Sequence, residues 1–78
     1  MSKRAPRVTG EQVARALERA GWRQVHERGG GSHRHYEFPG RPGIVTIAVH
    51  AGKIVPPGTL SNILRQAGLT ADELRELL

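Results

Sequence analysis

The sequence predicts an α+β fold in which a helix, three strands and a second helix follow one another along the chain. Three observations lead to this prediction. Apolar residues recur at helical spacing near both ends of the chain, short runs in the middle alternate as strands do, and clusters of glycine and proline separate the runs. Consecutive strands with short connections pair as antiparallel neighbours. We therefore expect a three-stranded antiparallel sheet.

Length and composition exclude several classes of protein. The chain has 78 residues, which is one small domain, because two cores of half that size would each need a metal or disulfides to fold. It contains no cysteine, which excludes disulfides and thiol chemistry. Its 12 Lys and Arg against 7 Asp and Glu give a net charge of +5, which indicates an anionic partner. No apolar run is long enough to span a bilayer and no signal peptide is evident, so we expect a cytoplasmic protein without a membrane segment.

The first helix is expected over Gly10–Ala20. Thr9 and Gln12 have the spacing of a capping box, which starts a helix. Gly21 is suited to the left-handed turn that ends one. The buried face of this helix is expected to consist of Val13, Ala16, Leu17 and Ala20.

The residues before this helix are basic and offer little apolar surface to bury. Chain ends of this kind are commonly mobile. We therefore expect residues 1–8 to be a flexible basic segment and residues 9–78 to be a single domain.

Three strands are predicted in the middle of the chain. The first is expected within Trp22–Arg28, before three successive glycines, and the second over His33–Phe38. The third is expected over Ile44–Val49, the most β-prone run, after a turn at residues 39–43. In the second strand, one face is expected to carry His33, His35 and Glu37, and the other Arg34, Tyr36 and Phe38.

A further long helix and a short terminal one are predicted in the last part of the chain. Pro57 suits the first turn of a helix, and Gly68 ends the periodic run. Thr70 and Glu73 repeat the capping-box spacing and start the terminal helix. The buried face of the longer helix is expected to consist of Leu60, Ile63, Leu64 and Ala67.

His33 is the strongest candidate for a functional side chain. It follows Gly31 and Ser32 at the end of a glycine-rich stretch, where backbone N–H groups and a hydroxyl can approach an anion closely. An imidazole at such a place can take up and release protons near neutral pH. The alternative is a plain turn, which the same residue types also favour.

Several basic residues lie in predicted loops and strand ends near the glycines. Unpaired positive charge at such positions indicates a phosphate-binding surface, whereas the basic residues of the first helix alternate with acids. The chain has one Trp, one Tyr and one Phe, which is few for a base-stacking platform, and Trp22 is expected in the core. The residues of the predicted basic surface are Arg28, Arg34, Arg41 and Lys53.

A metal site was weighed against these patterns. His33 and His35 share a strand face, and His26 or His50 would have to converge on them to complete a site. Neither the spacing nor any cysteine requires this. We expect no metal and no cofactor.

The ordered motifs resemble the HicA family of toxin mRNA interferases. The resemblance extends over roughly the whole of Thr9–Leu78. The sequence departs from the family pattern at a third glycine before Ser32 and at Ala48, where many members have proline. The motifs that carry the resemblance are Gly21-Trp22, Gly31-Ser32-His33, Val49-His50, Gly58-Thr59-Leu60 and Ile63–Gly68.

The resemblance implies a fold similar to a double-stranded-RNA-binding domain, with both main helices on one face of the sheet. It also implies a toxin that cleaves mRNA, that uses the histidine of its Gly-Ser-His motif, here His33, and that is blocked by a HicB-like antitoxin. RNA supplies its own 2′-hydroxyl nucleophile, so we expect a metal-independent endoribonuclease with His33 as general acid/base. The residues expected to bind RNA are Arg28, Gly31, Ser32, Arg34 and Lys53.

Two other interpretations fit the same residues. The first is a non-catalytic RNA-binding module of the same fold, in which the basic surface recognises the shape of RNA. The second is a protein whose basic surface serves only an acidic protein partner. Measurements of RNA binding and RNA cleavage at physiological salt separate the three.

Overall fold

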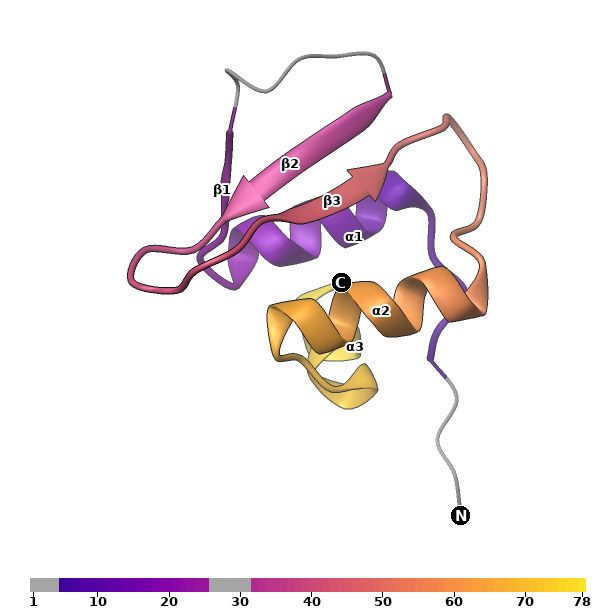
Figure 1. Ribbon diagram of the computed structural model, residues 1–78. Helices are drawn as coiled ribbons and strands as arrows, with labels where there is room; N and C mark the ends of the chain where they lie inside the picture. The colour runs from indigo at the N-terminus through magenta and orange to yellow at the C-terminus, as the bar shows by residue number, and fades with distance from the viewer. Residues whose placement is uncertain (1–4, 26–31) are drawn as a thin grey trace.

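In the computed structural model, which describes residues 5–25 and 32–78, three helices and three strands form an α+β fold (Figure 1). The predicted order of elements is confirmed. In chain order the elements are α1 (Gly10–Arg19), β1 (Arg23–Gln24), β2 (His33–Glu37), β3 (Val45–Ala48), α2 (Pro57–Ala67) and α3 (Ala71–Leu77).

The sheet is an antiparallel meander with the strand order β1-β2-β3. Between β2 and β3 the register places His33 opposite Ala48 and Tyr36 opposite Val45. Figure 1 shows α1 and α2 on the same side of the sheet, as expected for this fold. Within the described residues no helix covers the other side. We call it the open face, and it carries His33, His35 and Glu37 from β2 and Thr46 and Ala48 from β3.

Local signals set the ends of the helices, and each described below lies at the predicted residue or within one residue of it. The Thr9 side chain accepts a hydrogen bond from the Gln12 N–H, the Gln12 side chain accepts one from the Thr9 N–H, and Thr70 and Glu73 make the same reciprocal pair. Gly68 ends α2 in the left-handed conformation, with φ of 70°. α1 ends one residue earlier than predicted, at Arg19, with Ala20 as its C-cap.

The strands are shorter than predicted. β1 has two residues, although the Val25 N–H still donates to the His35 carbonyl at 2.7 Å. Residues 26–28 of the predicted first strand lie outside the described residues. β2 stops before Phe38, whose ring packs edge-on against Trp22 with 5.4 Å between the ring centroids. β3 is one residue shorter than predicted at each end.

The core lies between the sheet and the helices, and it begins earlier in the chain than expected. Val8 is 1% exposed, and its carbonyl accepts from the Val55 N–H at 2.8 Å. Val8 therefore belongs to the core and Ala5 packs partly against it, although the sequence offered little reason to expect either. The predicted buried faces of α1 and α2 are confirmed, except that Ala20 is only partly buried and Ala14 joins the core.

The first turn of α1 packs directly on the end of β3. A Cβ atom added to Gly10 would lie 2.5 Å from the Ala48 carbonyl oxygen and 3.1 Å from the Val49 Cα, which only glycine avoids. The close approach therefore ties the start of α1 to the end of the sheet where His33 and Ala48 face each other.

In the parts of the chain that the structure describes, no helix is both long enough and apolar enough to cross a membrane.

Candidate active site

His33 is the first residue of β2, and its side chain is exposed on the open face. The residue directly across from it on β3 is Ala48, whose methyl group offers no hydrogen bond. No other described residue donates a hydrogen bond to the imidazole or accepts one from it. The side chain thus lies on a strand, and none of the residues in 5–25 and 32–78 engages its ring nitrogens.

Ser32 anchors the backbone beside His33. Its carbonyl accepts from the Val49 N–H at 2.7 Å, which extends the β2–β3 ladder one pair beyond the strand ends. Ser32 is half-buried. Two other residues predicted to bind RNA, Arg28 and Gly31, lie outside the described residues.

Arg34 lies on the helix-facing side of β2, opposite to His33. Its Nη1 and Nη2 donate to Glu11 Oε1 and Oε2 at 3.2 and 3.1 Å, a bidentate ion pair with α1. The hydrogen bond to Glu11 raises the pKa of Arg34 above its ordinary value, with a smaller contribution from the Tyr36 hydroxyl. Arg34 would have to leave Glu11 before it could contact RNA beside His33.

Tyr36, also on the helix-facing side, ties the middle of β2 to α1. It is 0% exposed, and its hydroxyl donates to Glu18 Oε2 at 3.2 Å. Burial raises the pKa of Tyr36, the Glu18 carboxylate adds to the effect, and Arg34 opposes it. The side chain therefore holds the strand in place and takes no part in chemistry on the open face.

His35 shares the open face with His33 but already has a partner. Its Nδ1 lies 2.9 Å from Thr46 Oγ1 on the neighbouring strand. Within residues 5–25 and 32–78, no three His, Cys, Asp or Glu side chains gather as metal ligands would. His26, which was weighed as a possible ligand, lies outside the described residues.

His50 and Lys53 follow the end of β3, where Ala48 pairs with His33. The Lys53 N–H donates to the His50 carbonyl at 3.0 Å and closes a turn, and both side chains are exposed. Together with Ala48 they border a hollow of about 70 Å³, which is also lined by Ile47, Thr59 and Ile63 and so lies between β3 and α2. The predicted site set included Lys53 and omitted His50. His50 lies two residues beyond β3, and the signal for it is that an alternation continued past the strand end would place it on the face of Thr46 and Ala48.

Arg41, which was also assigned to the basic surface, lies at the opposite end of β2 and β3. Its guanidinium carbon is 5.6 Å from the centroid of the Trp22 ring, and its Nη1 donates to the Ala67 carbonyl at 3.1 Å. Trp22 itself is 5% exposed, which confirms that it is a core residue. Arg41 therefore fastens the turn after β2 to the end of α2.

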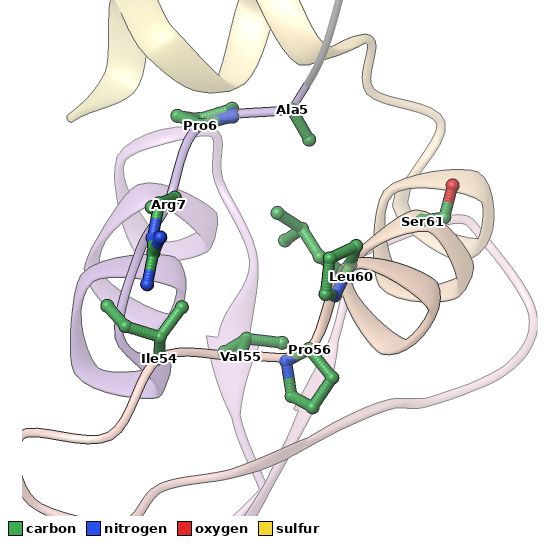
Figure 2. Close-up of a pocket in the computed structure, with 9 residues that line it drawn as sticks. Ala5, Pro6, Arg7, Ile54, Val55, Pro56, Leu60 and Ser61 are labelled. Atoms are coloured by element: carbon green, nitrogen blue, oxygen red, sulfur yellow. The ribbon is translucent and has the colours of Figure 1, made fainter.

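A larger hollow of about 680 Å³ lies between the chain before α1 and the start of α2. Figure 2 shows Arg7 and Ile54 on one side of it and Leu60 and Ser61 on the other. Most of its lining is apolar, and it contains none of the described residues of the predicted site. The exposed imidazole of His33 is separate from this hollow, on the open face.

Comparison with known proteins links this arrangement to one family. Residues 10–69 match the family model described as HicA toxin of bacterial toxin-antitoxin. The match extends from the first residue of α1 to the residue after the Gly68 cap, and so includes the whole sheet with His33 and His50. No curated protein shows significant similarity to the chain.

Proposed function

Because the chain belongs to the HicA toxin family of bacterial toxin–antitoxin systems, we propose that it is a metal-independent endoribonuclease that cleaves mRNA with His33 as general acid/base. Family membership makes it the toxin component and implies a cognate antitoxin. Cleavage of RNA and the role of His33 are the proposal.

The observation that carries the proposal is the position of His33. It is an exposed imidazole without a hydrogen-bond partner among the described residues, and it stands at the end of a strand of a chain with a net charge of +5. On the same face, His35 is engaged by Thr46, whereas the exposed imidazole of His33 can stay unpaired at little cost because water satisfies it. A general acid/base needs a ring nitrogen that is free to reach the substrate.

The chemistry of RNA suits such a site. The ribose 2′-oxygen attacks the adjacent phosphorus and expels the 5′-oxygen of the next nucleotide, so the protein has to move protons and stabilise negative charge. His33 moves a proton. Ser32 directly precedes His33 and Lys53 closes the turn after β3, and we expect them to supply a hydroxyl and a positive charge to the phosphate, with Arg28 and Gly31 as further predicted contacts.

We expect the antitoxin to be HicB-like and to inhibit the enzyme by covering the surface around His33. His33 on the open face and Lys53 after β3 are both exposed, so a protein that covers them excludes RNA. Acidic or hydrogen-bonding groups on the antitoxin would complement the positive charge there. Hydrogen exchange should then show protection of the β2–β3 end in the complex, and protection of α3 alone would contradict this mode of inhibition.

The experiment that tests the proposed function compares His33→Ala with His35→Ala. We expect His33→Ala to lower the cleavage rate of an RNA oligonucleotide by roughly 10²- to 10⁴-fold, the usual contribution of one general acid/base. His35→Ala is the matched control on the same strand face and should cleave nearly as fast as the natural protein. Both should melt at nearly the natural temperature, since His33 is exposed and His35 is not part of the core.

The chemical route has its own controls. Cleavage should continue in EDTA, should leave a 2′,3′-cyclic or 3′-phosphate end, and should fail when the nucleotide at the cut has a 2′-deoxyribose. Loss of cleavage in EDTA that zinc or magnesium restores would contradict the metal-independent mechanism. A protein that binds RNA and leaves it intact under all these conditions would be an RNA-binding module instead.

A further inference from the structure

We propose that His50 is a second proton-transfer residue, which acts together with His33 on one phosphate held above Ala48. The inference rests on the proposed ribonuclease activity and adds a catalytic residue to it. It starts from the backbone register of β2 and β3, which brings two histidines from distant parts of the sequence to one end of the open face.

The register can be followed one pair at a time. The Val49 N–H donates to the Ser32 carbonyl, which makes Ser32 and Val49 a hydrogen-bonded pair. Hydrogen-bonded and non-hydrogen-bonded pairs alternate in an antiparallel ladder, so His33 and Ala48 form a pair of the non-hydrogen-bonded kind, in which side chains lie closest together. His50 lies two positions beyond Ala48, the residue that faces His33.

The side chain of His50 belongs to the same face. Val49 packs against the core, and alternation along the chain then assigns Ala48 and His50 to the open face with His33. Residues that are diagonal neighbours on one face of an antiparallel pair are about 7–8 Å apart. His33 and His50 occupy such diagonal positions.

Ala48 makes this arrangement suitable for a ligand. Its methyl group is the side chain directly opposite His33, and it leaves space above the sheet between the two imidazoles. One pair further along β2, the opposite residue is Thr46, and it holds His35 by a hydrogen bond at 2.9 Å. His33 and His50 thus differ from His35 in having no side-chain hydrogen-bond partner among the residues that the structure describes.

Two proton-transfer groups are what the reaction requires. As the bond from the 2′-oxygen to phosphorus forms, one imidazole takes the proton of the 2′-hydroxyl. As the bond from phosphorus to the 5′-oxygen breaks, the other imidazole, in its protonated form, gives a proton to that oxygen. The attacking and leaving oxygens lie on opposite sides of phosphorus, so groups that flank the phosphate serve better than one group alone. Lys53, whose N–H closes the turn that begins at His50, adds positive charge for the phosphate.

The first part of the test is a comparison of His50→Ala and His50→Gln with His35→Ala. We expect both His50 variants to cleave ordinary RNA roughly 10²- to 10⁴-fold more slowly than the natural protein, and His35→Ala to cleave nearly as fast. Thermal melting controls for folding, and His50→Gln keeps a hydrogen-bonding side chain of similar size if His50→Ala unfolds. The pH–rate profile should be bell-shaped for the natural protein and for His35→Ala, and should lose one limb in His50→Gln.

The second part uses RNA in which sulfur replaces the 5′-oxygen at the cut, because a thiolate leaves without needing a proton. With this substrate, one of His33→Ala and His50→Ala should recover to within about tenfold of the natural protein, and the other should stay slow. That asymmetry identifies which histidine is the acid and which is the base.

The outcomes separate the two proposals. If the natural protein and all variants leave RNA intact, the proposed function fails. If His33→Ala is inactive while His50→Ala and His50→Gln cleave as fast as His35→Ala, the ribonuclease stands and the role of His50 is wrong. If the sulfur substrate rescues both variants or neither, His50 does not share proton transfer with His33.

Discussion

The two faces of β2 carry polar side chains of similar kinds and use them in opposite ways. On the helix-facing side, Arg34 forms a bidentate ion pair with Glu11, and the Tyr36 hydroxyl donates to Glu18. On the open face, His33 stands across from the methyl group of Ala48, and none of the described residues is its hydrogen-bond partner. Residues one position apart in the sequence thus differ in whether their polar atoms are already engaged.

This difference follows from whether each side of the sheet is covered by helices or faces solvent. A charge or hydroxyl that faces a helix has to be paired, because an unpaired polar group at a buried position costs free energy. A group on a solvent-facing side can stay unpaired at little cost, since water satisfies it. Such a group is therefore available for a substrate, and the functional residues of this protein are expected on the face that the helices leave uncovered.

The largest predicted effect is a loss of stability when Tyr36, on the helix-facing side of β2, is replaced. Tyr36→Ala removes a fully buried ring from the core and should lower the free energy of unfolding by about 3–5 kcal/mol. Tyr36→Phe keeps the ring and removes only the hydrogen bond to Glu18, which should cost about 1 kcal/mol. Urea unfolding of both variants measures the difference. Equal losses in the two would mean that the hydroxyl, and not the ring, stabilises the sheet on α1.

The next largest effect concerns the close approach of Gly10, at the start of α1, to the Ala48 carbonyl at the end of β3. Gly10→Ala places a methyl group 2.5 Å from the Ala48 carbonyl, so α1 or the end of β3 has to shift. Overpacking of this kind should cost about 1–3 kcal/mol of unfolding free energy. Because Ala48 lies across from His33, RNA cleavage should slow at temperatures where the variant remains folded. The control is Gly58→Ala, where an added Cβ would meet no atom within 4 Å. Unchanged cleavage by folded Gly10→Ala would show that the open face does not depend on this contact.

A smaller effect is expected on the salt dependence of RNA binding when Lys53, which is exposed, or Arg34, which is paired with Glu11, is replaced. RNA affinity, measured at several salt concentrations in the inactive His33→Ala background, should have a log–log slope that Lys53→Gln flattens by about 0.7, the value of one single-strand phosphate contact. Arg34→Gln should flatten it less, because the Arg34 guanidinium is engaged by Glu11. This ion pair is about one-third exposed, with side-chain exposures of 34% and 41%, so its loss should cost about 0–1 kcal/mol of stability. If Arg34→Gln flattens the slope as much as Lys53→Gln, Arg34 leaves Glu11 when RNA binds.

The smallest effect appears as a pH dependence of stability. Burial, together with the Glu18 carboxylate, raises the pKa of Tyr36 above 10.0, so the folded state resists ionisation more than the unfolded state does. This contribution to stability is complete below pH 10 and is lost as the pH rises through the raised pKa. Unfolding measured at several pH values should show the natural protein losing stability more steeply than Tyr36→Phe above pH 10. Parallel curves would show that Tyr36 ionises equally easily in both states.

Much of the fold was predictable because its signals are local. The Thr9–Gln12 and Thr70–Glu73 capping boxes, and the left-handed Gly68, each depend on residues within one turn of a helix. Strand order followed from short connections, and the prominence of His33 followed from its position after glycine and serine. Val8 was missed because a single valine in a basic segment carries no periodicity.

Local patterns in the sequence were thus enough to predict the helices, the antiparallel meander and His33 as the leading candidate residue. Which neighbours of His33 have a partner among the described residues could be learned only from the folded chain. Arg34 and Lys53 look alike as basic residues near glycines, but Glu11, 23 positions before Arg34, engages one of them. His35 and His50 likewise look alike until Thr46, 11 positions after His35, is seen to hold the first. The physical reason is that backbone conformation responds to near neighbours, whereas the partner of a side chain is set by register and packing between segments far apart in the chain.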